Sequence, residues 1–108
     1  MQHQGDNKIN SAHTLAESIS MQRMIHTKYN GIQLRLAPHQ LFVRNEALYL
    51  GAFNPEKKRR SDEAPSLGFF NVSGMSGVEL SNATFEPIPD FNGEPPRSCD
   101  MMLVTLRL

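Results

Sequence analysis

The dipeptide Asn30-Gly31 constrains the fold of this chain more than any other feature, because it lies between two runs of alternating apolar and polar residues. Both residues tolerate the positive φ angles of a two-residue hairpin turn, and the alternation is typical of half-buried strands. The register that follows places His26 opposite Arg35 on a face towards water. Three pairs lie on the face towards the core: Tyr29 with Ile32, Thr27 with Leu34, and Ile25 with Leu36.

An amphipathic helix is expected over residues 11–22, before the hairpin. Asn10 or Ser11 can cap its start by accepting a hydrogen bond from a free backbone amide. Residues 1–10 are polar and are expected to be flexible. Four apolar residues of the helix recur with the spacing of one helical face: Ala12, Leu15, Ala16 and Ile19.

Short extended runs separated by turn residues follow the hairpin. Pro38 has no amide hydrogen to donate, so we expect it to break the second strand. Later strands are expected over 41–43, 47–53, 67–72 and 78–85, with a turn at 44–46 and a glycine-rich connection at 73–77. This pattern predicts a mainly β fold class with one N-terminal helix, as a small β-barrel of about five strands. A chain of 108 residues is expected to form one domain.

The run from Ala47 to Phe53 alternates as a strand with two different faces. One face carries Leu48, Leu50 and Ala52, and the other, outward face carries Tyr49, Gly51 and Phe53.

Eleven basic and eleven acidic residues give a net charge of zero, which excludes a general attraction to nucleic acid. Any phosphate binding must therefore come from a local cluster of basic residues. One cluster lies in the expected exposed loop 56–66, where Asp62 and Glu63 follow it, so it is either an anion site or a solvated surface. Its members are Lys57, Lys58, Arg59 and Arg60.

The chain carries no motif for a membrane span, a metal site or catalysis. No apolar run approaches about 20 residues, the N-terminal residues lack the pattern of a signal peptide, and Cys99 is the single cysteine. We therefore expect a cytoplasmic location, no membrane association, no metal, no cofactor and no enzymatic activity. Ligand-like spacing is lacking among all four histidines: His3, His13, His26 and His39.

The C-terminal residues 88–108 are expected to form a linker and a terminal strand. Residues 86–96 contain four prolines. The run Met101 to Leu108 has the composition of a strand, whose partner lies either in another element or outside this sequence.

The order of these elements resembles the WYL domain family. The resemblance is carried by a strand with Tyr29, the Pro38-His39-Gln40-Leu41 step, a short turn, and Leu48-Tyr49-Leu50 in place of the Trp-Tyr-Leu triplet. It covers residues 11–87, as helix 11–22 and barrel 24–87, and implies an Sm-like barrel that follows a winged helix-turn-helix in bacterial transcription regulators. Such a domain senses a ligand without catalysis, and in several members the ligand is nucleic acid or a nucleotide.

The resemblance also implies a groove lined by the triplet tyrosine and by arginines. Asn71 and Gly74 stand where arginines are expected, so two strong phosphate ligands are missing. Either other basic residues supply the charge, or the groove binds something less anionic, or sensing is lost. The candidate ligand contacts are Tyr49, Arg35, His26, His39, Arg44, Lys57, Lys58, Arg59, Arg60 and Asn71.

A structural role is the alternative function. In it the barrel is an assembly module without a ligand, whose exposed edge strands and terminal strand pair with a second copy or a partner protein.

Overall fold

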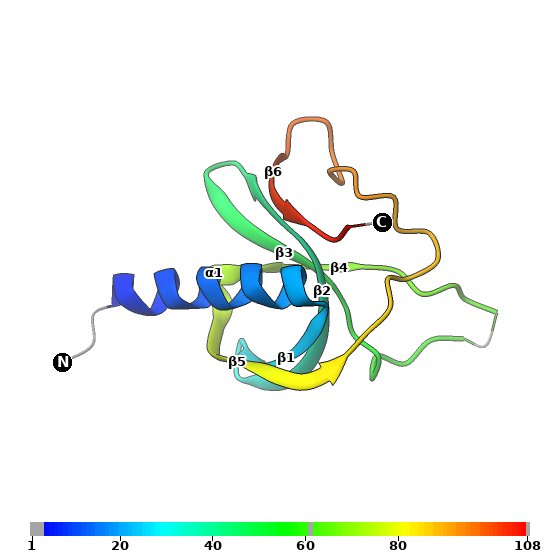
Figure 1. Ribbon diagram of the computed structural model, residues 1–108, viewed down its shortest axis with the longest axis horizontal. Coiled ribbons are helices and arrows are strands. Elements are labelled where there is room, and N and C mark those ends of the chain that lie inside the picture. Colours follow the sequence, from blue (N-terminus) through cyan, green and yellow to red (C-terminus); the bar gives the residue numbers. More distant parts are fainter. Residues whose placement is uncertain (1–3, 61, 108) are drawn as a thin grey trace.

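The computed structural model describes residues 4–60 and 62–107, with side chains from residue 10 onwards. One helix is followed by six strands, which form a small barrel-like antiparallel fold (Figure 1). The expected fold class is thereby confirmed. In chain order the elements are α1 (Gln4–Met21), β1 (Arg23–Tyr29), β2 (Ile32–Arg44), β3 (Ala47–Phe53), β4 (Gly68–Asn71), the 3₁₀ helix η1 (Val72–Gly74), β5 (Met75–Thr84) and β6 (Met101–Thr105).

Strand β2 is long and belongs to two sheets. Its residues 32–36 pair with β1, which also pairs with β5, and these three strands form the first sheet. Its residues 37–44 pair with β3 on one edge and, over residues 40–43, with β6 on the other. Strand β4 pairs with β3 and completes the second sheet. The bend of β2 between the two sheets curves the fold around its core (Figure 1).

The hairpin at Asn30-Gly31 has the predicted register at every pair, including His26 with Arg35. Asn30 has a φ of 49° and Gly31 a φ of 85°, as the tight turn requires. The expected inner face is buried at Ile25, Thr27 and Leu36, whereas Ile32 beside the turn is exposed. The core-facing side of the hairpin was therefore predictable from alternation alone, except at its tip.

Pro38 does not end β2, and this expectation was wrong. Up to Leu36 the strand pairs with β1, and from Ala37 it pairs with β3, so Pro38 lies where the strand changes partner. The register with β3 also shifts between Pro38 and Gln40. A residue without an amide hydrogen is tolerated at such an irregularity because the ladder is already interrupted there.

The connection expected at 73–77 was also wrong. Residues 72–74 form η1, and β5 begins at Met75 and runs through Gly77. Tyr29 of β1 pairs with Met75, and Gly77 takes a positive φ of 58°. Pairing with β1 therefore overrides the turn composition of this stretch, and the glycine provides the irregular backbone that the strand needs.

Helix α1 begins at Gln4, earlier than the expected start near residue 11, so Asn10 and Ser11 lie inside it and do not cap it. In the sequence, residues 4–10 contain a single apolar side chain besides glycine, that of Ile9, so periodicity could not reveal this part of the helix. The helix packs on β5, β1 and β2. Its Leu15 and Ile19 join a buried cluster with Val72 of η1 and with strand residues that include Ile25, Leu36, Leu41, Leu50, Ala52 and Met75.

Gln22 joins the end of α1 to the end of β5. Its φ of 51° ends the helix. Its backbone carbonyl accepts a hydrogen bond from Phe85 N at 3.1 Å, and its Nε2 donates to Phe85 O at 3.2 Å. The helix end and the chain that leaves β5 are thereby held together.

Residues 86–100, here called the 86–100 segment, contain no helix or strand but do not behave as a free linker. The segment lies over β2, where Phe91 packs against the core cluster. It leads into β6, which pairs with β2. Of the two partners left open for the terminal strand, another element of the same chain is therefore the one observed. No helix within the described residues has the length and apolar character needed to cross a membrane.

Candidate functional site: the outward face of the second sheet

The outward face of the second sheet carries two rows of residues that cross three strands. The register aligns Phe42, Tyr49 and Asn71 in one row across β2, β3 and β4. It aligns Gln40, Gly51 and Phe69 in the next row. Residues opposite each other in a sheet share a face, so these six positions form one surface. The 86–100 segment lies along its β2 side.

Gln40 is the buried polar residue of this surface, with a residue exposure of 2%. Its Nε2 donates to the backbone oxygen of Glu94 at 3.1 Å, which fixes the orientation of the amide because only nitrogen can donate to a carbonyl. The Oε1 accepts no hydrogen bond from any residue that the structure describes. Across the register, Thr105 of β6 has a buried Oγ1 without a partner among those residues, whereas Gln40 Oε1 is open to solvent.

Gly51 makes the position of Gln40 possible. A Cβ on Gly51 would lie 2.7 Å from Gln40 Cγ and 3.0 Å from its Oε1. Any other residue at position 51 would therefore compete with the amide for the same space.

Arg44 lies against a cluster of aromatic rings. Its guanidinium carbon is 5.1 Å from the ring centre of Phe42, 5.5 Å from that of Tyr49 and 5.8 Å from that of Phe69. Phe42 and Tyr49 stack at 5.9 Å with an interplanar angle of 13°. Tyr49 is half-buried and lies outside the core cluster, as its predicted outward position requires, but Phe42 stacks on its ring.

Asp100 binds Arg44 through both carboxylate oxygens, at 2.8 Å and 2.7 Å. Its Oδ2 also accepts a hydrogen bond from Arg97 N at 3.0 Å. Hydrogen bonding to Arg44 lowers the pKa of Asp100, and the same bonds raise the pKa of Arg44. The pair ties the end of the 86–100 segment to β2 and neutralises the charge of Arg44.

His39 fixes the start of the 86–100 segment. The ring is fully buried. Its Nε2 accepts a hydrogen bond from Ile88 N at 3.0 Å, so Nδ1 carries the proton and donates to Ala37 O at 2.8 Å. Burial lowers the pKa of His39, against a smaller opposite effect of the Ala37 carbonyl. Both ring nitrogens are used inside the protein, and the ring also contacts Phe85 and Phe91.

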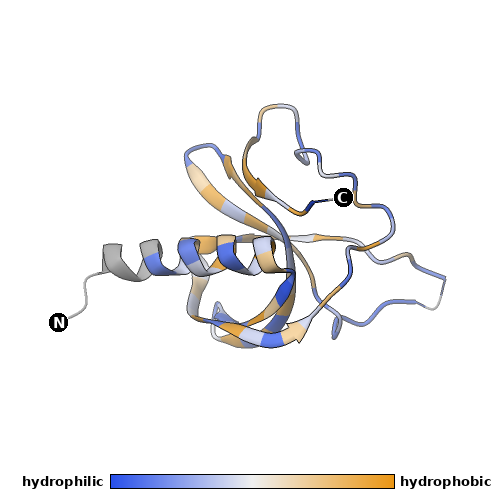
Figure 2. Cartoon of the chain, in the orientation of Figure 1, coloured by the Kyte–Doolittle hydropathy of each residue, from blue (hydrophilic) through white to orange (hydrophobic). Residues whose placement is uncertain are grey.

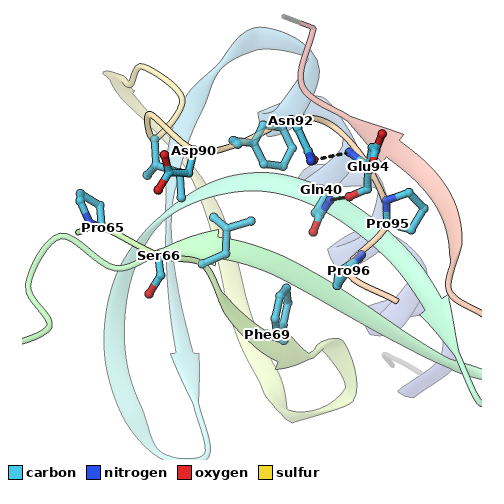
Figure 3. A pocket seen from close by; sticks show the side chains of 12 residues that line it. Gln40, Pro65, Ser66, Phe69, Asp90, Asn92, Glu94, Pro95 and Pro96 are labelled. Carbon is cyan, nitrogen blue, oxygen red and sulfur yellow. Dashed lines mark hydrogen bonds between the residues drawn. The ribbon is translucent and has the colours of Figure 1, made fainter. Parts of the chain in front are cut away.

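An open cavity of about 470 Å³ lies between the chain entering β4 and the 86–100 segment (Figure 3). Gln40 and Phe69 line it from the sheet, and Phe69 is 45% exposed. The other described lining residues are apolar, small polar or acidic: Pro65, Ser66, Leu67, Ile88, Asp90, Phe91, Asn92, Glu94, Pro95 and Pro96. No lysine, arginine or histidine is among these described lining residues.

The predicted ligand contacts do not converge on one site. Tyr49, Arg44 and Asn71 lie on the outward face of the second sheet, but Arg44 is bound to Asp100, and Asn71 Oδ1 accepts from Ser73 N and Oγ. His26 and Arg35 are exposed on the first sheet, and His39 is buried. The four basic residues Lys57, Lys58, Arg59 and Arg60 lie in an exposed hydrophilic loop after β3 (Figure 2).

Sequence reasoning missed the residues that build the cavity. The alternation that places Gly51 outward indicates Gln40 opposite it only when the strand continues through Pro38, and proline composition predicts the opposite. Asp90, Glu94 and Asp100 gave no signal, because no local pattern shows that the 86–100 segment folds back on β2. Comparison with protein-family models, curated proteins and solved structures finds no match for this chain.

Proposed function

We propose that this chain is a non-enzymatic ligand-sensing domain of the WYL type, in which the cavity beside Gln40 is the binding site. The observation that carries the proposal is this cavity, whose volume of about 470 Å³ lies in the range of about 300–1,000 Å³ common for ligand pockets. Its lining combines apolar side chains with a few polar groups, as such pockets usually do.

The buried amide of Gln40 gives further support. Its Oε1 has no hydrogen-bond partner among the described residues and is open to solvent, since the buried side-chain atom without a partner is Thr105 Oγ1. Gln40 Oε1 lies on the cavity side of the amide, turned away from Glu94 (Figure 3). A bound molecule with a donor group would satisfy this acceptor.

A nucleic-acid ligand has less support than a small molecule. Binding to phosphates needs several cationic side chains that act together. Arg44 is neutralised by Asp100, Arg35 lies on the first sheet, and residues 57–60 lie in a separate loop. We therefore propose a small ligand, whose occupancy of the cavity alters an attached DNA-binding segment.

A fragment screen followed by amide chemical shifts tests the proposal. We expect shifts at Gln40, Phe69 and residues 90–94 when fragments bind. Ser66→Trp should fill the cavity mouth and abolish those shifts, whereas Ser20→Trp on the exposed face of α1 should leave them unchanged. Shifts that survive Ser66→Trp, or that lie on the first sheet, would contradict the proposed site.

An assembly module is the second candidate function, and strand β6 is the observation that favours it. Strand β6 pairs only with β2 among the described strands, and its Met101 and Leu103 are 64% and 52% exposed. An edge strand with apolar side chains can pair with the same strand of a second copy. Sedimentation of the wild type and of Leu103→Lys tests this, and a monomer at all concentrations would exclude it.

A further inference from the structure

We infer that the cavity beside Gln40 selects an organic cation, namely an ammonium, amidinium or guanidinium group carried on an apolar body. This inference rests on the proposed function and names the class of ligand. Three independent features of the lining support it: the charges, the acceptor of Gln40, and the exposed aromatic wall.

The charge of the lining is negative. Asp90 and Glu94 are exposed residues of the 86–100 segment that line the cavity, and the described lining contains no basic side chain. Arg44, on the same face of the second sheet, is already paired with Asp100. An anionic ligand would therefore meet two like charges, whereas a cation would meet two opposite charges.

The polar group on the sheet side of the cavity is an acceptor. Gln40 lies 98% buried, and its bond to Glu94 O fixes Oε1 as the atom left for a ligand. An N–H donor suits this oxygen, and a carboxylate or phosphate oxygen does not. This acceptor is independent of the two surface carboxylates, and it requires a donor group, which an ammonium, amidinium or guanidinium carries.

The apolar wall accommodates the body of such a ligand. Phe69 is 45% exposed, and Leu67, Phe91 and Pro95 extend the apolar surface around the cavity. Aromatic faces attract cations as well as apolar groups. The cavity thus combines an acceptor on the sheet, apolar walls and carboxylates on the segment that covers it (Figure 3).

Three probes of matched size test the inference: benzamidinium, benzamide and benzoate. They share a phenyl ring and differ in charge, so a titration followed by amide chemical shifts isolates the charge preference. We expect benzamidinium to bind at least about tenfold more tightly than benzoate, with benzamide between them, and its affinity to fall as NaCl is added. Benzoate binding as tightly as benzamidinium, or no shift with benzamidinium at millimolar concentration, would overturn the inference.

Variants that each remove one negative charge show where the preference for a cation arises. In Asp90→Asn and Glu94→Gln we expect the affinity for benzamidinium to fall about three- to tenfold each, while that for benzamide changes little. Glu79→Gln removes the same charge from an exposed position on β5 and should have no effect. An equal loss of affinity for benzamidinium in Glu79→Gln would show that the overall charge of the protein, and not the cavity, attracts the cation. That result would also overturn the inference.

Two further probes distinguish the source of the cation. n-Butylguanidinium carries one guanidinium on an alkyl chain, and a capped pentapeptide with a central arginine and four uncharged residues carries the same single charge on a protein backbone. Tighter binding of n-butylguanidinium supports a small-molecule ligand, and tighter binding of the peptide supports a basic segment of a partner. Failure is also distinguishable: neutral fragments that bind in the cavity without a cation preference would leave the proposed function intact and remove only this inference.

Discussion

The side chain of Gln40 on β2 lies directly over the backbone of Gly51 on β3. A methyl group on Gly51 would come within 2.7 Å of Gln40 Cγ, closer than carbon atoms approach each other without repulsion. The glycine is not there for an unusual backbone angle, since it is not among the residues with positive φ. It is there because the amide that faces the cavity occupies the space of its side chain.

Gly51→Ala should therefore lower the free energy of unfolding by about 1–3 kcal/mol, the usual cost of overpacking. Urea denaturation measures it. Because the clash is with Gln40, the double variant Gln40→Ala/Gly51→Ala should lose less than the sum of the single variants. Strictly additive losses would show that the two residues do not compete for space.

Asp100→Asn should lower the midpoint of thermal unfolding at neutral pH, because it leaves Arg44 without its carboxylate partner. The pKa of Asp100 is lowered in the folded state, so its contribution is present above the ordinary aspartate pKa of about 3.9 and is lost as the pH falls through the lowered value. Acid denaturation of the wild type should thus be steeper than that of Asp100→Asn. Asp62→Asn, at an exposed position, is the control and should follow the wild type.

His39 should make the fold sensitive to mild acid. Its folded pKa is lowered, so the folded state binds the proton less well than the unfolded chain, and stability is present above about pH 6.5 and declines as the pH falls below it. Protonation of Nε2 would also remove the acceptor of Ile88 N. Thermal melts from pH 7.5 to pH 5 should show this decline in the wild type and in the exposed-residue control His26→Gln. The melting temperature of His39→Gln should be lower at every pH and should change less between pH 7.5 and pH 5.

Gly74→Arg, which restores an arginine expected from the WYL resemblance, should destabilise the fold by about 1–3 kcal/mol. A Cβ at this position would lie 2.9 Å from Asn30 Oδ1 and 3.1 Å from Tyr29 Cε1, so these side chains at the hairpin turn would have to move. Chemical denaturation compares it with His13→Arg, an arginine added at an exposed position of α1. A neutral effect would mean that the turn yields easily and that the glycine has another cause.

Local chemistry made part of the fold predictable. The Asn30-Gly31 turn and the alternation on either side define one register, and every predicted pair is observed. Strand β3 was predicted at its exact bounds for the same reason, since a second tight turn at Asn45 and Glu46 precedes a clear alternation. In both places the determining contacts lie within a few residues along the chain.

Pairing between residues far apart in the sequence determined the parts of the fold that were not predicted. Strand β5 forms through residues of turn composition because β1 is available to pair with them, and β2 continues through Pro38 because β3 takes over from β1. The candidate site depends on the return of the 86–100 segment, which residues such as Ile88 and Asp100 attach to β2 from about fifty residues away. A proline-rich stretch has no periodicity from which such contacts could be predicted, so its composition predicts a linker.

The two hydrogen bonds between Gln22 and Phe85 couple two parts of the molecule that are distant in the sequence. They join the residue that follows α1 to the residue that precedes the 86–100 segment. The start of this segment is also bound to β2, through His39 and Ile88. If a bound molecule displaced the start of the segment, the end of α1 would have to follow it or both bonds to Gln22 would have to break. On the proposed function, α1 is therefore one route, beside β2 and β6, by which occupancy of the cavity would be transmitted through the chain.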